Sequence, residues 1–174
     1  MENMENNTME STPKIQQATF LSSDALLAQW QGHRNLTRRV IEAFPEDKLF
    51  TYSIGGMRPF AELAMEMVRM AAPGVRGVVV GKWQSWDELA KAYPTPRTKD
   101  ELLAFWDRAT EQINSLWPHI PQERFHEMDK FFGLYEGPIY WSILYLVDNE
   151  IHHRGQGYVY LRSLGIEPPP FWER

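Results

Sequence analysis

Residues 137–164 read GPIYWSILYLVDNEIHHRGQGYVYLRSL, and this stretch gives the strongest indication of the fold. It opens at Gly137-Pro138, contains no further proline, and is followed by Gly165, a residue type that commonly caps the C-terminus of a helix. Apolar residues dominate its first half and recur through the second. The stretch therefore predicts one long helix that is largely buried by other elements.

A polar stripe runs along this predicted helix. Asn149 and His153 are four residues apart, about one helical turn, so they lie one above the other on the same face. Gln156 and Tyr160 continue the stripe at helical spacing. Polar groups on an otherwise apolar helix need partner side chains or a ligand. The stripe is therefore a candidate site, and a metal ion is the first ligand to consider.

Three further segments show the apolar periodicity of helices. They span residues 22–44, 59–80 and 98–117. The second contains Pro73-Gly74, which is expected to kink or end it, and its valine-rich continuation could form a strand or more helix; we favour helix. Four long helices without a clear strand pattern predict an all-α fold, an up-down four-helix bundle.

The segments between these helices are expected to be irregular. Residues 45–58 form a connection, residues 84–97 a linking loop with one short helix, and residues 118–135 a long loop. Residues 1–16 are polar and predict a disordered arm. Residues 17–174 are expected to form a single domain, which is long enough to bury a sizeable core.

Composition excludes several classes of function. The 174 residues carry a net charge of −5, which argues against nucleic acid as a partner. No cysteine is present, so any metal must be bound by nitrogen and oxygen. No segment reaches the roughly 20 apolar residues of a membrane span, and no signal peptide opens the chain. We expect a cytoplasmic protein that acts on a small molecule and contacts neither nucleic acid nor membrane.

The block HHRGQGYVYLRSLGIEPPPF, residues 152–171, resembles the DinB/YfiT-like family of small helical metalloproteins, which is unrelated to the DNA polymerase of that name. Members typically read H-x-x-H-H-R-G-Q here, followed by Y-x-R-x-x-G and prolines. The resemblance covers most of residues 20–172, although only this block is specific. It implies a four-helix bundle with a long connection between the second and third helices, as the periodicity also indicates.

The resemblance also implies a metal site. In the family a zinc or nickel ion is held by a histidine of the second helix and by two residues four apart on the fourth. Carried over to this sequence, the ligands are Glu66, one turn after the F-x-E-L segment at residues 60–63, together with Asn149 and His153. Glu66 and Asn149 depart from the usual histidines. Such a set could hold a divalent ion (Ni, Zn, Mn or Fe), or could form a hydrogen-bond network without one.

Two classes of function follow from the resemblance. The first is a metal-dependent thiol transferase, isomerase or hydrolase, in which Glu62 or Glu66 would take the proton from a metal-bound thiol or water. The second is a non-catalytic bundle with a degenerate metal site that binds a small molecule or a protein partner. The resemblance also implies a homodimer. Aromatic content suggests that the substrate entrance is lined by Trp83, Trp86, Tyr140 and Trp141.

The residues around His153 are assigned to supporting roles. His152 points about 100° away from His153, so it is expected at a boundary or an interface. Arg154 is expected to pair with an acid, and Gln156 to hold His153 in place, with direct ligation by Gln156 as the alternative. Glu150 is expected to be solvated.

Overall fold

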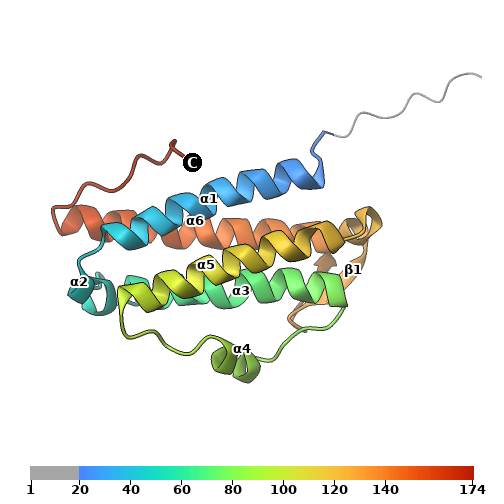
Figure 1. Cartoon of the computed structure of the whole chain (residues 1–174), viewed down its shortest axis with the longest axis horizontal. Helices are drawn as coiled ribbons and strands as arrows, with labels where there is room; N and C mark the ends of the chain where they lie inside the picture. The colour runs from blue at the N-terminus through green and yellow to red at the C-terminus, as the bar shows by residue number, and fades with distance from the viewer. Residues whose placement is uncertain (1–19) are drawn as a thin grey trace, which may run out of the picture.

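The structure is a computed structural model that describes residues 20–174. Four long helices lie side by side along the molecule (Figure 1). They are α1 (Ser23–Ala43), α3 (Phe60–Val80), α5 (Lys99–Leu116) and α6 (Ile139–Ser163). Helices α1 and α3 each pack against both α5 and α6. The predicted all-α bundle is confirmed, whereas the prediction of a disordered arm at residues 1–16 lies outside the described residues.

Short elements connect the long helices. They are α2 (Glu46–Thr51), α4 (Trp86–Ala92), the 3-10 helices η1 (Trp117–His119) and η2 (Gln122–His126), and the strands β1 (Met128–Phe131) and β2 (Tyr135–Pro138). The short helix predicted within residues 84–97 is α4, while α2 was not predicted. The prediction of a long loop at residues 118–135 is wrong, because this segment contains η2 and most of an antiparallel hairpin. The backbone turns at Phe132 and Gly133, where φ is 48° and 71°.

Helix α3 continues through Pro73 to Val80, and Gly81 then ends it with a φ of 68°. The valine-rich continuation is thus helical, which confirms the prediction of helix rather than strand, and Pro73 does not end the helix. The following Gly74 leaves room for neighbours, since a Cβ there would lie 2.9 Å from a methyl carbon of Leu146. Burial of this segment against α6 and β1 compensates for the hydrogen bond that a proline cannot donate.

The core fixes the spacing between α3 and α6. Its largest side chains come from several helices and include Trp30, Phe60 and Trp106, each no more than 1% exposed. Gly157 of α6 meets Phe60 of α3 so closely that a Cβ on the glycine would lie 2.4 Å from the ring. The Phe60 ring in turn stacks on Phe44 at 4.9 Å. The two helices therefore approach each other one turn away from the candidate site.

None of the helices in residues 20–174 combines the length and the apolar character needed to cross a membrane.

Candidate functional site

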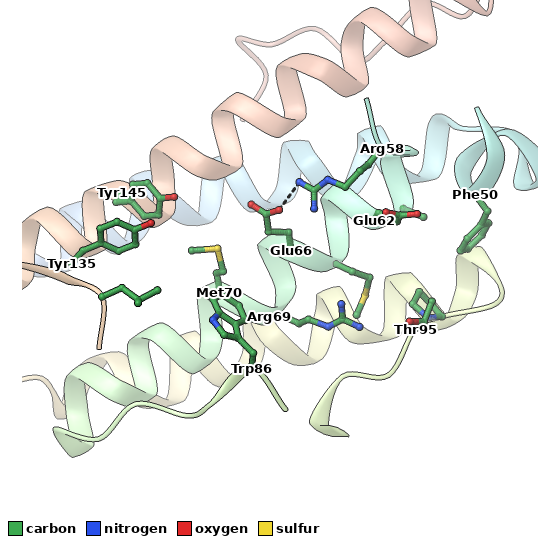
Figure 2. Close-up of a pocket in the computed structure, with 14 residues that line it drawn as sticks. Phe50, Arg58, Glu62, Glu66, Arg69, Met70, Trp86, Thr95, Tyr135 and Tyr145 are labelled. Carbon is green, nitrogen blue, oxygen red and sulfur yellow. Dashed lines mark hydrogen bonds and ion pairs between the residues drawn. The ribbon is translucent and has the colours of Figure 1, made fainter. Parts of the chain in front are cut away.

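The structure brings the three residues of the carried-over ligand set together between α3 and α6. Glu66 Oε1 lies 3.0 Å from His153 Nε2 and accepts a hydrogen bond from the Asn149 amide nitrogen at 3.2 Å. Its second oxygen, Oε2, accepts a hydrogen bond from Arg58 at 2.5 Å (Figure 2). Three side chains therefore contact the Glu66 carboxylate, Asn149 and His153 at Oε1 and Arg58 at Oε2.

His153 is fixed in orientation by two acceptors. Its Nε2 faces the Glu66 carboxylate, and its Nδ1 lies 2.8 Å from Gln156 Oε1. With an acceptor at each ring nitrogen, the arrangement favours the doubly protonated imidazolium. Burial alone would lower the pKa of His153, but the hydrogen bonds to Glu66 and Gln156 outweigh it and raise the pKa. Gln156 thus has the supporting role that its position in the sequence suggested.

Glu66 is held in its charged form. Its hydrogen bond with His153, aided by Arg58 and Asn149, lowers its pKa from 4.5 to about 2 although burial acts in the opposite direction. A carboxylate with so low a pKa accepts protons poorly at neutral pH. Glu62, the other predicted base, lies at an exposed position one turn earlier on α3, with no hydrogen-bond partner among the described residues.

The donor set at this site differs from that of typical zinc and nickel centres. It offers one imidazole, one carboxylate and one carboxamide, whereas zinc and nickel sites are richer in nitrogen. The charge of Glu66 is already balanced by Arg58, and a divalent ion at Oε1 would have to displace a proton from His153. Among residues 20–174, no three His, Cys, Asp or Glu side chains are grouped so that they could hold a metal. The residues present do not fit a zinc or nickel centre.

A cavity of about 650 Å³ lies beside Glu66. One wall is α3, which contributes Glu62, Glu66 and Arg69, and aromatic side chains close the cavity from α4, β2 and α6 (Figure 2). These aromatic residues are Trp86, Tyr135 and Tyr145. The site is thus a concave surface that joins a fixed carboxylate to apolar rings, which is the usual composition of a small-molecule pocket.

The predicted aromatic entrance is only partly present. Of the four proposed residues, Trp86 alone lines the cavity. Trp83 instead packs against Phe131, with 5.0 Å between the rings, and Trp141 lines a smaller hollow nearby. The sequence reasoning missed Tyr145, although it lies four residues before Asn149 and therefore on the same helical stripe. No pattern in the sequence marked Arg58 or Arg69.

Glu150 is not solvated, and that prediction is wrong. It is 1% exposed and accepts hydrogen bonds from Trp30, Thr37 and Arg34, the last of which also forms an ion pair with it. Burial raises the pKa of Glu150 against the opposing effect of Arg34. The reason is that α6 packs against α1 as well as α3, so a second face of the helix is also inside the bundle.

Arg154 lies in the same interior region as Glu150 but does not form the expected ion pair. It donates hydrogen bonds to the His33 carbonyl and to the Thr37 hydroxyl, and a further nitrogen lies 3.1 Å from His33 Nδ1. His152 is exposed, and its ring lies against that of His153 with 5.1 Å between the centroids. Neither residue reaches the cavity beside Glu66.

Comparisons with known proteins agree with the helical fold. The fold resembles a DinB-like protein from Bacillus cereus, with a TM-score of 0.64 and 20% identity over 84% of this chain and 95% of that one. It also resembles the DinB-like protein YjoA from Bacillus subtilis, with a TM-score of 0.66 and 18% identity over 86% and 99% of the two chains. No curated protein matches the sequence significantly. The model of the DinB family matches residues 9–174, and the chain belongs to that family.

Proposed function

We propose that this chain binds an organic small molecule in the cavity beside Glu66, and that Glu66, held in place by Arg58, Asn149 and His153, is a fixed polar group in the cavity wall. The observation that carries the proposal is the cavity itself, about 650 Å³ in volume and lined by aromatic rings together with a charged carboxylate. Pockets of this size and composition are typical of sites for drug-sized ligands.

The network supports a binding role because the charge and the orientation of Glu66 are fixed before a ligand binds. Glu66 keeps its charge over the whole physiological pH range, since its pKa is about 2. Arg58, Asn149 and His153 hold it in one orientation, so a ligand meets a preorganised acceptor and little side-chain entropy is lost on binding. A ligand that donates a hydrogen bond to Glu66 would compete with Arg58, which is the most exposed of the three partners.

A metal-dependent transferase, isomerase or hydrolase is the competing proposal, since the family resemblance implies it. One distance favours it: 3.0 Å between Glu66 Oε1 and His153 Nε2 is also the separation of adjacent ligands about 2.1 Å from one ion. Metal analysis of protein purified without chelator separates the two proposals. We expect no bound metal in the wild type and uptake of nickel or zinc by Asn149→His. Stoichiometric metal in the wild type would favour the enzyme.

Ligand binding to the cavity is tested by NMR of methionine methyl groups. Met65 and Met70 line the cavity, whereas Met67 lies in the core away from it and reports on general changes. We expect hits from a fragment library to shift the first two signals and to leave the third in place. Glu66→Gln should weaken hits that donate hydrogen bonds, and Glu111→Gln, at an exposed position of α5 outside the cavity, serves as its matched control. A library without any hit would contradict the proposal.

We propose further that the protein is a cytoplasmic homodimer. Exposed apolar side chains on α6, among them Trp141, Ile151 and Val159, support self-association, since such surface is costly to leave in water. Light scattering at micromolar concentration is the test. A mass of twice 20.4 kDa supports the dimer, and a mass of 20.4 kDa contradicts it.

A further inference from the structure

Arg69 has a geometry that the proposed binding role alone does not explain. It lies on the cavity wall, half-buried, and both its Nε and its Nη2 donate to a single acceptor, the backbone carbonyl of Tyr93, at 3.0 and 2.8 Å. This double contact fixes the plane of the guanidinium. A guanidinium has five N–H donors, so most of its capacity remains for another partner. Figure 2 shows the group pointing into the cavity on the side of Thr95.

The charge of Arg69 has no counter-charge within the described residues. Both carboxylates that share its wall are engaged elsewhere or exposed: Glu66 pairs with Arg58 and His153, and Glu62 faces solvent without an ion-pair partner. A half-buried cation of this kind has lost part of its hydration, and pairing with an anion compensates for that loss. The carbonyl of Tyr93 is neutral and does not supply that charge.

We infer that the ligand of this cavity is an organic carboxylate whose anionic group pairs with Arg69 and whose apolar body lies against Trp86 and Met70. The inference rests on the proposed binding function and adds the chemical class of the ligand. The planar guanidinium matches a carboxylate through two parallel hydrogen bonds. The cavity offers apolar surface for the rest of the ligand, because Met70 and Trp86 also line it.

Three probes of the same shape test the charge requirement. They are naphthalene-2-carboxylate, naphthalene-2-carboxamide and 2-naphthylmethylammonium, and their dissociation constants are measured from the methyl signals of Met65 and Met70. We expect the carboxylate to bind roughly tenfold or more tighter than the carboxamide, with the ammonium weakest. Equal binding of carboxylate and carboxamide overturns the inference and leaves the proposed function intact. Failure of the carboxylate to bind also overturns the inference, whereas the proposed function falls only if the fragment library gives no hit.

Substitution of Arg69 tests whether its guanidinium is the group that pairs with the carboxylate of the ligand. Arg69→Gln is expected to weaken the carboxylate about tenfold and to change the carboxamide by less than about twofold. Arg76→Gln is the matched control, since Arg76 lies two turns later on α3, is exposed and does not line this cavity. Because Arg69 also holds the Tyr93 carbonyl, Arg69→Lys is measured alongside: it keeps the charge, and it should retain part of the preference for the carboxylate. An unchanged preference in Arg69→Gln refutes the assignment.

Discussion

Helix α6 takes part in two polar networks that differ in their access to solvent. Towards α3, Asn149 and His153 meet Glu66 at the wall of a cavity, where the Glu66 side chain is 28% exposed. Towards α1, Glu150 meets Arg34 in the core, where the two side chains are 1% and 0% exposed. The second network is enclosed by the core and borders no cavity that contains Glu66. The contrast indicates that the open network is available for function and that the closed one serves the fold.

The two glutamates also show how surroundings set the charge of one residue type. The hydrogen bonds of Glu66 lower its pKa to about 2, whereas burial raises the pKa of Glu150 despite its Arg34 partner. A carboxylate at a cavity keeps part of its hydration, so its partners act on a group that is already stable as an anion. A carboxylate in the core depends entirely on its partners for that stability.

Removing the core carboxylate should have the largest effect. Glu150→Ala leaves Arg34 charged and unpaired among apolar residues, and we expect it to lower the free energy of unfolding by about 3–5 kcal/mol. Glu66→Ala should cost less, about 1–2 kcal/mol, because Arg58 regains water while only His153 stays buried without its acceptor. Urea unfolding monitored by circular dichroism measures both. Equal losses for the two variants would contradict the distinction between a closed and an open network.

The free energy of unfolding should respond to pH in opposite directions at His33, which lies on the side of the closed network, and at His153 of the open network. His33, which contacts Arg154 and Arg174, has its pKa lowered from 6.5 to about 4 by burial and by these charges, so its contribution to stability is lost as pH falls from 6.5 towards 4. His153 has a raised pKa, so its contribution is present below 6.5 and is lost as pH rises through the folded-state value.

Two glutamine variants test this dependence. Compared with the wild type, His33→Gln should gain relative stability at about pH 5, and His153→Gln should be more destabilising at about pH 6 than at about pH 9. Urea midpoints over that range give the result. The same trend with pH in both variants would remove the distinction.

The smallest effects are expected at the rim of the open network. Arg58→Gln removes an exposed ion pair with Glu66 and should cost about 0.2–1 kcal/mol, with less effect at high salt. Glu62→Gln should change the free energy of unfolding by less than about 0.5 kcal/mol. Thermal unfolding at low and high salt checks both values. A larger cost at Glu62 would show that this carboxylate has a structural partner in solution.

The sequence predicted α1, α3 and α5 because each has an apolar face of helical period, and α6 because it is a long, mostly apolar stretch between Pro138 and Gly165. It also placed Glu66 near Asn149 and His153, since helical spacing fixed two of the residues and family resemblance the third. The hairpin was missed for a physical reason: its strands have four residues each, and its turn places Phe132, rather than asparagine, at positive φ.

The burial of Glu150 was missed for a different reason. Glu150 points away from Asn149 and was therefore expected in solvent, whereas α6 is covered on two sides and its apolar residues are spread around the axis. Pairing between Glu150 and Arg34, which are 116 residues apart, depends on tertiary contacts that no local pattern records. The same holds for Arg69, whose partner carbonyl lies beyond α4.

The contact between Gly157 and Phe60 bears on how freely the site between α3 and α6 can be substituted. A methyl group at residue 157 would push against a ring that Phe44 already holds, so the backbones of α3 and α6 would have to move apart. Their separation is thereby independent of which side chains bridge them one turn away. Side chains that face this gap, such as Asn149, can therefore be substituted while the gap itself stays constant. In Asn149→His the new imidazole would face Glu66 across an unchanged distance between the helices, because Gly157 and Phe60 fix that distance.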